Sequence, residues 1–322
     1  MIESLKRGRD GRSCFAHGRP SAFAGAGIIC PEESNEGYAM RIFLAGGTGV
    51  IGTRLIPRLV AAGHEVTATT RRAERADRLS RLGARPAVID VYDAEGLTEA
   101  VKQAKPDVVL HELTDLSDYD IDANSRLRRE GTANLVAAAQ EAGASRVLVQ
   151  SITWIFPDAT TPATEDDPII PGTAVDVMEQ LAGRLPHATI LRYGMLYGPD
   201  TWYSRGGRHA EAVQAGQLPA TPAITCFVQI DDAVAATVSA LDWPEGVYHI
   251  VDDEPAPGTT WLPVFAEAFG APPPAVEPLP EAKPLGRPVS NAKARSRGWT
   301  PTYPSWRDGF AALAHPKPND ER

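Results

Sequence analysis

A glycine-rich turn is the sequence feature that most constrains how this chain can fold. The apolar segment MRIFLA starts at Met40, the sequence GGTGVIG follows it, and TRLIPRLVAAGH then has the apolar spacing of an amphipathic helix. In such a turn the first glycine permits a tight reversal, the second lets the backbone approach a pyrophosphate, and the third lets the helix pack against the strand. The free N–H groups at the helix start can bind phosphate oxygens. The turn therefore predicts a dinucleotide-binding site made by Gly46, Thr48, Gly49, Val50, Ile51 and Gly52.

Segments typical of strands and of helices alternate after this turn. Residues 64–72, 84–90, 106–113, 145–151 and 188–194 read as strands, with helical patterns between them at 95–104 and 128–143. Such alternation predicts an α/β fold with a Rossmann-type doubly wound parallel sheet and a smaller C-terminal substrate lobe.

Three regions of the chain are expected from this reading. Residues 1–39 form an N-terminal extension that is disordered, precedes the true start at Met40, or folds back as a lid. Residues 40–194 form a NAD(P)-binding Rossmann domain. Residues 195–322 are mainly the substrate lobe, from which 226–243 returns to the Rossmann domain.

The residues that end the second predicted strand indicate which dinucleotide binds. An acidic side chain at this point hydrogen-bonds the ribose 2′-hydroxyl of NAD, whereas this chain has Thr70, Arg71 and Arg72. No carboxylate stands there to repel a 2′-phosphate, and a guanidinium can bind that group with two hydrogen bonds. We therefore predict that Arg71 and Arg72 favour NADPH, with NADH as the alternative cofactor. In the other interpretation, the two arginines are solvated charges at the start of a helix.

The carboxyl ends of parallel strands form one edge of a sheet, and ligands bind beyond that edge. This rule brings residues from the third to the sixth predicted strand to one rim. They are Asp90, Val91, Leu113, Thr114, Ser151, Thr153, Arg192 and Tyr193. We expect the cofactor to lie across this rim.

Composition excludes several other classes of protein. The net charge of −9 disfavours binding to nucleic acid, and no apolar run reaches the roughly 18 residues that span a bilayer. Cys14, Cys30 and Cys226 form no CxxC pair, and the seven histidines are scattered. We therefore expect reduced thiols, no metal site and a cytoplasmic location. The expected partner is a small-molecule substrate, and the sequence does not indicate an oligomeric state.

Several longer motifs resemble those of one enzyme family. GGTGVIG at 46–52, EGTANLVAAAQEAG at 130–143, LRYGMLYGPD at 191–200 and the segment at 291–310 are similar to motifs of the extended short-chain dehydrogenase/reductases, the NAD-dependent epimerase/dehydratase family. The resemblance spans about residues 40–315. It implies that Asp90 and Val91 lie against the adenine, Leu113 and Thr114 near the ribose and nicotinamide, and Tyr193 by the nicotinamide.

The residue pair that transfers a proton in this family is absent from the chain. Family members use a Tyr-x-x-x-Lys pair, followed four positions later by a Glu, in which the lysine lowers the pKa of the tyrosine. If Glu179 is that Glu, Val175 stands in place of the lysine and Pro171 in place of the tyrosine. No tyrosine occurs between Tyr119 and Tyr193, so another register does not restore the pair. The resemblance is therefore to an atypical member that lacks the usual proton relay.

Other side chains must then assist any proton transfer. Ser151, Thr153 and Tyr197 are the candidate catalytic donors to a substrate carbonyl, with water or a phenol of the substrate as the proton source. Arg128 replaces the asparagine that the family has in its fourth helix. It lies in the charged run 126–130, which is interpreted most simply as a solvated helix face.

Aromatic residues gather after the fifth and sixth predicted strands, where a substrate pocket is expected. Their flat faces suit a planar, mostly apolar ligand, and ordinary core packing is the alternative interpretation. These residues are Trp154, Phe156, Tyr193, Tyr197, Trp202 and Tyr203.

Three functions fit these features. The first is a NAD(P)H-dependent ketoreductase that reduces a polycyclic aromatic, polyketide-type ketone of the kind found in antibiotic biosynthesis. The second is a nucleotide-sugar epimerase or dehydratase, for which Arg205, Arg208 and Arg287 could bind the diphosphate. The third is a non-catalytic NADP-binding redox sensor, a role that the loss of the usual dyad would permit.

Overall fold

The computed structural model describes residues 39–114, 120–281 and 283–314, all of which belong to one compact unit of the chain. The expected N-terminal extension, with Cys14 and Cys30, lies outside the described residues except for Ala39.

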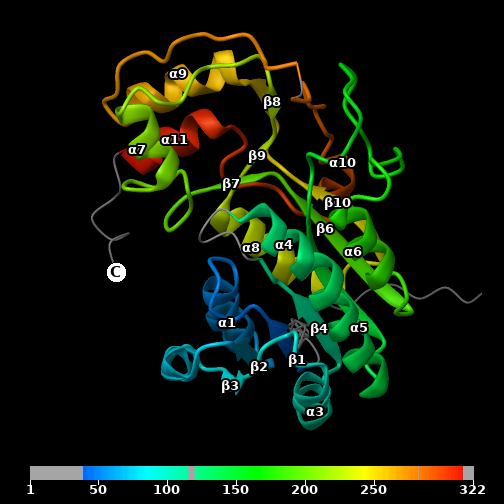
Figure 1. Cartoon of the computed structure of the whole chain (residues 1–322). Coiled ribbons are helices and arrows are strands. Elements are labelled where there is room, and N and C mark those ends of the chain that lie inside the picture. The colour runs from blue at the N-terminus through cyan, green and yellow to red at the C-terminus, as the bar shows by residue number, and fades with distance from the viewer. Residues whose placement is uncertain (1–38, 115–119, 282, 315–322) are drawn as a thin grey trace, which may run out of the picture. The chain divides into compact units, whose positions relative to one another are not determined.

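A seven-stranded sheet forms the centre of this unit, in the order β10-β6-β5-β4-β1-β2-β3 (Figure 1). Every pairing within it is parallel. Its strands are β1 Arg41–Ala45, β2 Glu65–Thr70, β3 Arg85–Val88, β4 Val108–His111, β5 Arg146–Ile152, β6 His187–Tyr193 and β10 Gly246–Ile250. The chain runs from β1 outward to β3 and then returns to β4 on the other side of β1. The predicted doubly wound parallel sheet is confirmed, and its topological switch point lies between β1 and β4.

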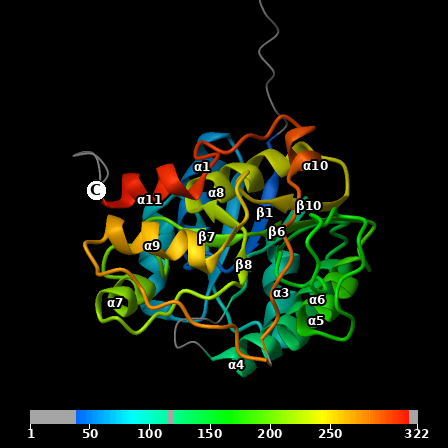
Figure 2. The same cartoon turned by 90° about the horizontal axis from the view of Figure 1, so that it is seen from above.

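Helices cover both faces of the sheet because successive strand residues point to opposite sides. In β1, Ile42 and Leu44 join the core on one face, whereas Phe43 and Ala45 join the core on the other. The first core is formed with α1 and α8, and the second with α3, α5 and α6 (Figures 1 and 2). These helices are α1 Gly52–Ala61, α3 Ala94–Ala104, α5 Thr132–Glu141, α6 Ala174–Ala182 and α8 Ile230–Ser239.

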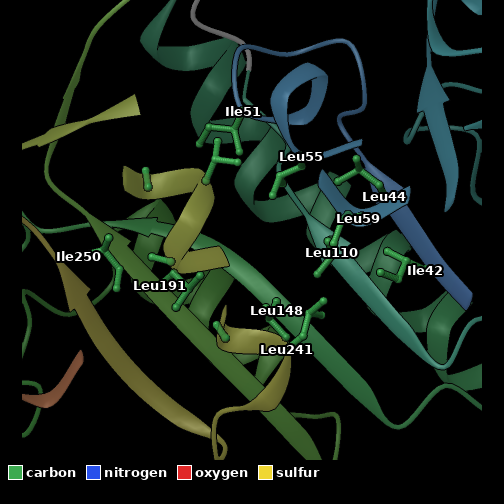
Figure 3. Close-up of a cluster of buried hydrophobic side chains, with 14 of the residues drawn as sticks. Ile42, Leu44, Ile51, Leu55, Leu59, Leu110, Leu148, Leu191, Leu241 and Ile250 are labelled. Atoms are coloured by element: carbon green, nitrogen blue, oxygen red, sulfur yellow. The ribbon is translucent and has the colours of Figure 1, made fainter. Parts of the chain in front are cut away.

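Figure 3 shows the first core, where Leu44 and Leu110 from the sheet meet Leu55 and Leu59 of α1. Each of these four side chains is fully buried. Burial of an aliphatic side chain of this size contributes about 1.5–3 kcal/mol. This packing fixes α1 against the sheet and so fixes the glycine-rich turn that precedes it.

Shorter elements complete the Rossmann part. Arg71 and Arg72 are followed by η1 Ala73–Arg75 and α2 Ala76–Arg81, and α5 is preceded by α4 Ile121–Arg126 and η2 Leu127–Gly131. The single helix expected over 128–143 is thus the second half of a longer helical segment. Its middle turn, η2, has the wider π-helical winding.

The lobe beyond the sheet has its own aromatic core. The helices α7, α9 and α11 lie together in both views (Figures 1 and 2). They enclose buried side chains that include Tyr197, Phe227, Phe265 and Phe310. The lobe elements are α7 Arg208–Gln214, α9 Gly258–Ala268, α11 Trp306–Ala314 and the short strands β7 Met195–Tyr197, β8 Ile224–Thr225, β9 Phe227–Gln229 and β11 Ala256–Pro257.

The return of the chain to the sheet goes further than 226–243. After α8 come η3 Ala240–Asp242 and then β10, which pairs with β6 as the outer strand of the main sheet. The helix α10 Ala292–Arg295 follows later, and Trp299 beyond it packs into the first core. Residues 246–250, which were expected in the substrate lobe, therefore belong to the sheet.

A buried aspartate on α8 helps to hold the C-terminal segment in place. Asp232, on α8, accepts hydrogen bonds from the backbone N–H groups of Thr302 at 2.8 Å and Tyr303 at 3.1 Å. The indole N–H of Trp299 donates to the carbonyl oxygen of the same aspartate at 3.2 Å. These bonds fasten the segment before α11 to the Rossmann part.

Candidate active site

The loop between β1 and α1 is shaped by contacts that only glycine permits. Gly46 has φ of +100°, and a Cβ placed on it would lie 2.3 Å from the carbonyl oxygen of Glu112. A Cβ on Gly52 would lie 2.3 Å from the carbonyl oxygen of Gly46. The N–H of Gly49 closes the turn by donating to that same oxygen at 3.1 Å. The loop therefore packs directly against the end of β4, at the switch point of the sheet.

The same loop leaves backbone donors available for a ligand. No described residue accepts a hydrogen bond from the N–H groups of Thr48, Val50 or Ile51. These groups lie at the start of α1, where the helix dipole adds partial positive charge. The cradle therefore fits the pyrophosphate of a dinucleotide.

The residues predicted for the adenosine end follow β2 and β3. Arg71 and Arg72 come directly after β2, and both are exposed. Asp90 is exposed after β3, and its carboxylate accepts the N–H of Tyr92 at 3.0 Å, while Val91 is buried. The structure brings these four predicted residues to one end of the rim. Their contacts with adenosine stay a prediction.

At the end of β4, a buried carboxyl group lies beneath the rim. Burial raises the pKa of Glu112 to about 8, and the hydroxyl of Tyr193 donates to its carboxyl at 3.4 Å. The Tyr193 hydroxyl also lies 2.5 Å from that of Thr237 on α8. Tyr193 is thus a buried residue that connects the end of β4 to α8 beneath the rim. Leu113, which is half-buried, and Thr114, which is exposed, continue the chain above it.

Ser151 is committed to a buried charged network at the end of β5. Its hydroxyl donates to the carboxylate of Glu179 at 2.5 Å. The guanidinium of Arg192 donates two hydrogen bonds to the same carboxylate, at 3.0 and 2.7 Å. All three side chains are buried. The prediction that the Ser151 hydroxyl is free to donate to a substrate is therefore wrong, because Glu179 takes that hydrogen bond.

Thr153 differs from Ser151 although it lies only two residues further on. Its backbone N–H donates to the carbonyl oxygen of Tyr193 at 3.0 Å, which fixes the residue at the junction of β5 and β6. No described residue takes a hydrogen bond from its hydroxyl. Thr153 is therefore the predicted donor that the geometry leaves available.

Tyr197 cannot act as the predicted proton donor. Its side chain is fully buried in the lobe core, edge-on to Phe227 and Phe310 at centroid distances of 6.1 and 5.2 Å. A Cβ on Gly309 would lie 2.1 Å from its hydroxyl oxygen. Burial raises the pKa of this phenol well above its usual range. The expectation failed because the chain turns away from the rim after β6 and carries this side chain into the lobe.

The positions of the missing proton relay hold inert side chains. Val175 is 4% exposed in α6, and Pro171 is exposed just before that helix. Lys293 does lie over the ring of Tyr248, 4.8 Å from its centroid. Tyr248 is on the outer strand β10 and Lys293 is on α10, and the Tyr248 hydroxyl donates to the carbonyl of Pro244 at 2.9 Å. It therefore does not replace the relay.

Most of the predicted aromatic cluster is core, as the alternative interpretation held. Phe156, Tyr193, Tyr197 and Tyr203 are all buried. Trp154 is the exception, because its side chain is 53% exposed directly after Thr153. Trp202 is half-buried, so Trp154 has the most exposed ring of the six.

Two of the arginines considered for a diphosphate are bound within the protein. Arg205 donates to the carbonyl of Ala314 at 2.7 Å. Arg287 donates to the carbonyl of Thr161 at 2.8 Å and to Asp167 at 3.1 Å. These bonds weaken the nucleotide-sugar interpretation.

Two features of the rim were missed in the sequence. The first is the buried network of Glu179 and Arg192, although both residues lie in recognisable family motifs. The second is the π-turn η2 and its residue Arg128, whose half-buried side chain does not fit a wholly solvated helix face. The unusual residue at that position was the available signal.

Within residues 39–114, 120–281 and 283–314, no cluster of three or more His, Cys, Asp or Glu side chains could hold a metal ion. In that same part of the chain, every helix is too short or too polar to cross a membrane.

Comparison with known proteins bears directly on this site. Residues 46–181 match a family model described as NAD(P)H-binding. The 3-diazoavenalumate denitrifying reductase of a Streptomyces species is 41% identical over 305 residues, which cover 84% of this chain and 99% of that protein. The chain belongs to the NAD(P)-binding short-chain dehydrogenase/reductases of the epimerase/dehydratase type.

One further relative of this short-chain dehydrogenase/reductase is more distant, and a solved structure shares its fold. A Stigmatella aurantiaca ketoreductase of 4-hydroxy-2-methyl-3-oxo-4-farnesyl-3,4-dihydroquinoline-1-oxide is 34% identical over 120 residues, covering 37% of this chain and 35% of that protein. The UDP-glucose 4-epimerase of Thermus thermophilus, solved with NAD, has a TM-score of 0.70 at 24% identity and covers 85% of this chain and 98% of that one. The protein is an NAD(P)-dependent reductase of this family, and the structural likeness extends over the whole fold.

Proposed function

We propose that this enzyme uses NAD(P)H to replace the diazo group of a planar aromatic carboxylate by hydrogen, with release of dinitrogen. The observation that carries the proposal is the pair of inert residues, Pro171 and Val175, where the family has its proton relay. The relative that matches along its whole length is named a denitrifying reductase of a diazo carboxylate. Hydride transfer to a diazo group that is already protonated takes no further proton, so this step fits a rim that lacks the family's tyrosine and lysine.

The electrons and protons consumed in the proposed reaction are consistent with the absence of the family's tyrosine and lysine. The nicotinamide supplies a hydride, that is, one hydrogen nucleus and two electrons. In the protonated diazo form, an arenediazonium, the C–N bond breaks and a C–H bond forms, while nitrogen leaves as neutral N2. No proton enters in that step. Reduction of a ketone, in contrast, needs a proton on the oxygen, which a positioned acid supplies for a rate gain of about 10²–10⁴.

The chain's own residues then have positioning roles. We assign the pyrophosphate to the N–H groups of Thr48, Val50 and Ile51, and the 2′-phosphate to Arg71. Trp154 offers its exposed face to a flat substrate. The buried network at Ser151 holds the end of β5 rigid beneath both. Orientation of this kind can supply a large part of the lowering of the barrier.

A second candidate is reduction of a polycyclic aromatic ketone of the polyketide type. The free hydroxyl of Thr153 favours it, because that hydroxyl can donate to a carbonyl oxygen. The distant Stigmatella relative, a ketoreductase, also favours it. A phenol next to the ketone would polarise the carbonyl through an internal hydrogen bond and so replace the missing tyrosine.

Isotope transfer tests the first candidate against the second. The enzyme is incubated with 3-diazoavenalumate and NADPH deuterated at either face of C4, in ordinary water and in D2O. We expect one N2 for each NADPH oxidised, deuterium from NADPH on the carbon that carried nitrogen, and none from D2O at that carbon. Release of N2 without transfer of the label would overturn the proposal. Turnover of a hydroxylated polycyclic ketone, with no reaction of the diazo compound, would favour the second candidate.

A further inference from the structure

The π-turn η2 interrupts the helix that runs from Ile121 to Glu141. An α-helix with one wider turn is rare, and such turns are frequent at functional sites because they re-aim a side chain. The turn here spans Leu127–Gly131, and Arg128 lies within it. Leu127 is buried in the core, which fixes the orientation of the turn.

The charged residues next to Arg128 are all engaged in ordinary surface contacts. Arg126 and Glu130 form an exposed ion pair at 2.8 Å, and Arg129 donates to the carbonyl oxygen of Gly172 at 3.0 Å. Arg128 is different. Its side chain is half-buried, and no described residue accepts a hydrogen bond from its guanidinium.

Leaving such a group without a partner is unfavourable. A guanidinium has five N–H donors, and removing a charged group from water without compensating hydrogen bonds costs free energy. Burial accordingly lowers the pKa of Arg128, and no carboxylate of the described residues opposes the shift. The fold thus maintains a partly desolvated positive charge that nothing in the described chain neutralises.

Arg128 lies on the half of the rim where the chemistry is expected. Burial lowers the pKa of His111, the last residue of β4, and the charge of Arg128 lowers it further. The Nε2 atom of His111 lies 2.8 Å from the hydroxyl of Thr132. The turn η2 packs on α6, the helix that carries Val175 in place of the family's lysine. The turn also packs on Val91, which follows β3, so it lies between the end of β4 and the end of the rim where the adenosine is expected.

We infer that Arg128 binds the carboxylate of the substrate and so selects anionic substrates. The inference rests on the proposed function, since it assigns the acid group of that substrate. A planar guanidinium can hold a carboxylate with two parallel hydrogen bonds. The pyrophosphate has its own donors in the loop at 46–52, so Arg128 is available for a second anion. The residue thereby orients the substrate without touching the reacting atoms.

The preference for an acid over its ester tests this role. Rates with NADPH are measured for 3-diazoavenalumate and for its methyl ester in wild type, Arg128→Gln and Arg126→Gln. We expect Arg128→Gln to raise KM for the acid by roughly 10- to 100-fold and to leave KM for the ester within about twofold. Arg126→Gln removes the same charge from the exposed side of the same helical segment, and it should keep the acid preference of wild type. An unchanged acid-to-ester ratio in Arg128→Gln overturns the inference.

A binding measurement keeps the inference testable if the proposed reaction fails. Calorimetry with enzyme saturated with NADP⁺ compares 4-hydroxycinnamate, an aromatic carboxylate, with its methyl ester. We expect tighter binding of the acid, a loss of that difference in Arg128→Gln and a partial recovery in Arg128→Lys. Failure of the diazo substrate to react, together with this pattern, would overturn only the proposed reaction. Equal binding of acid and ester by wild type would overturn the role of Arg128.

Discussion

At the scale of single residues, Ser151 and Thr153 show how two hydroxyls at one rim can have different uses. The Ser151 hydroxyl is held by Glu179 at 2.5 Å, whereas the Thr153 hydroxyl has no partner among the described residues. The first therefore stabilises the fold, and the second can meet a substrate.

Substitution of each residue by alanine should separate these uses. Ser151→Ala removes a buried hydrogen bond to a charged group, so the free energy of unfolding should fall by about 1.5–3 kcal/mol. Thr153→Ala should lower kcat for an aromatic ketone by roughly 10- to 100-fold and leave the diazo reaction unchanged, since only the ketone needs a donor. Urea denaturation and steady-state kinetics measure the two effects. If Thr153→Ala still reduces the ketone at the wild-type rate, Thr153 is not the donor.

Cofactor preference is expected to depend on Arg71. Arg71→Asp places a carboxylate where we expect the 2′-phosphate, and it should weaken NADPH relative to NADH by roughly 10- to 100-fold. Dissociation constants for both cofactors, measured by fluorescence titration, give this ratio. Arg81→Asp, at an exposed position on α2, makes the same charge change and should leave the ratio unaltered. An unaltered ratio in Arg71→Asp contradicts the prediction.

The sequence was informative about residues whose role follows from the backbone, and less so about those whose role follows from packing. Gly46, with φ of +100°, was predicted correctly as the glycine of the tight reversal, and Gly52 as a position of close packing, because the strand–turn–helix pattern determines both. Tyr197 was predicted wrongly as a donor, because its burial depends on Phe227 and Phe310, which are distant in sequence. The engagement of Ser151 with Glu179 could not be foreseen for the same reason.

At the scale of elements, two glycines of the loop between β1 and α1 allow an effect on stability to be distinguished from an effect on cofactor affinity. Gly49 is exposed, and a Cβ there would lie 3.3 Å from the Gly46 carbonyl oxygen. On Gly52 the distance is 2.3 Å, and the contact is with backbone that cannot easily move. A methyl group on Gly49 would therefore mainly enter the space for the ligand, whereas one on Gly52 would collide with the backbone of the loop.

Alanine at these glycines should give two distinct results. Gly49→Ala should keep the melting temperature close to wild type and weaken NADPH by at least about tenfold, because the methyl group occupies the approach of the pyrophosphate. Gly52→Ala should also lower the free energy of unfolding by about 1–3 kcal/mol through overpacking. Thermal melts and cofactor titrations provide both readouts. Gly183→Ala is the control, since a Cβ there meets only ordinary contacts at 3.6 Å. Wild-type NADPH affinity in Gly49→Ala would contradict the assigned cradle.

The elements of the Rossmann part were predictable because each has a clear period. The buried strands are short apolar runs, and α1 and α3 have apolar residues on one side only. The π-turn η2 could not be predicted, because its extra residue leaves the helical composition of 121–141 unchanged. The local sequence pattern also could not show that β10 belongs to the main sheet, since its pairing with β6 joins segments more than fifty residues apart.

At the scale of the whole molecule, buried titratable groups make stability depend on pH. Burial raises the pKa of Glu112 and of Asp252 to about 8. It lowers the pKa of His111 and of His249 to about 4. The two carboxyls contribute stability that is present below pH 4 and is lost as the pH rises to 8. The two histidines contribute stability that is present above pH 6.5 and is lost as the pH falls to 4.

These slopes oppose each other below pH 6.5 and predict a stability that falls from about pH 6.5 to 8. In the upper window only the carboxyls act, and each contributes up to about 1.4 kcal/mol per pH unit. Urea denaturation at intervals of half a pH unit measures the profile. Glu112→Gln and Asp252→Asn should each halve the decrease in the free energy of unfolding between pH 6.5 and 8. A wild-type profile that rises between pH 6.5 and 8 would contradict the assigned burial of these carboxyls.

The bonds that Asp232 makes to Trp299, Thr302 and Tyr303 affect the order in which a newly made chain can mature. Trp299 fills the core beside α1, and Phe310 fills that of the lobe, so both interiors stay open while translation is still short of these residues. A nascent chain with such openings exposes apolar surface and is prone to aggregation. The turn that cradles the dinucleotide is translated early, yet the core beneath it is complete only when Trp299 has emerged from the ribosome.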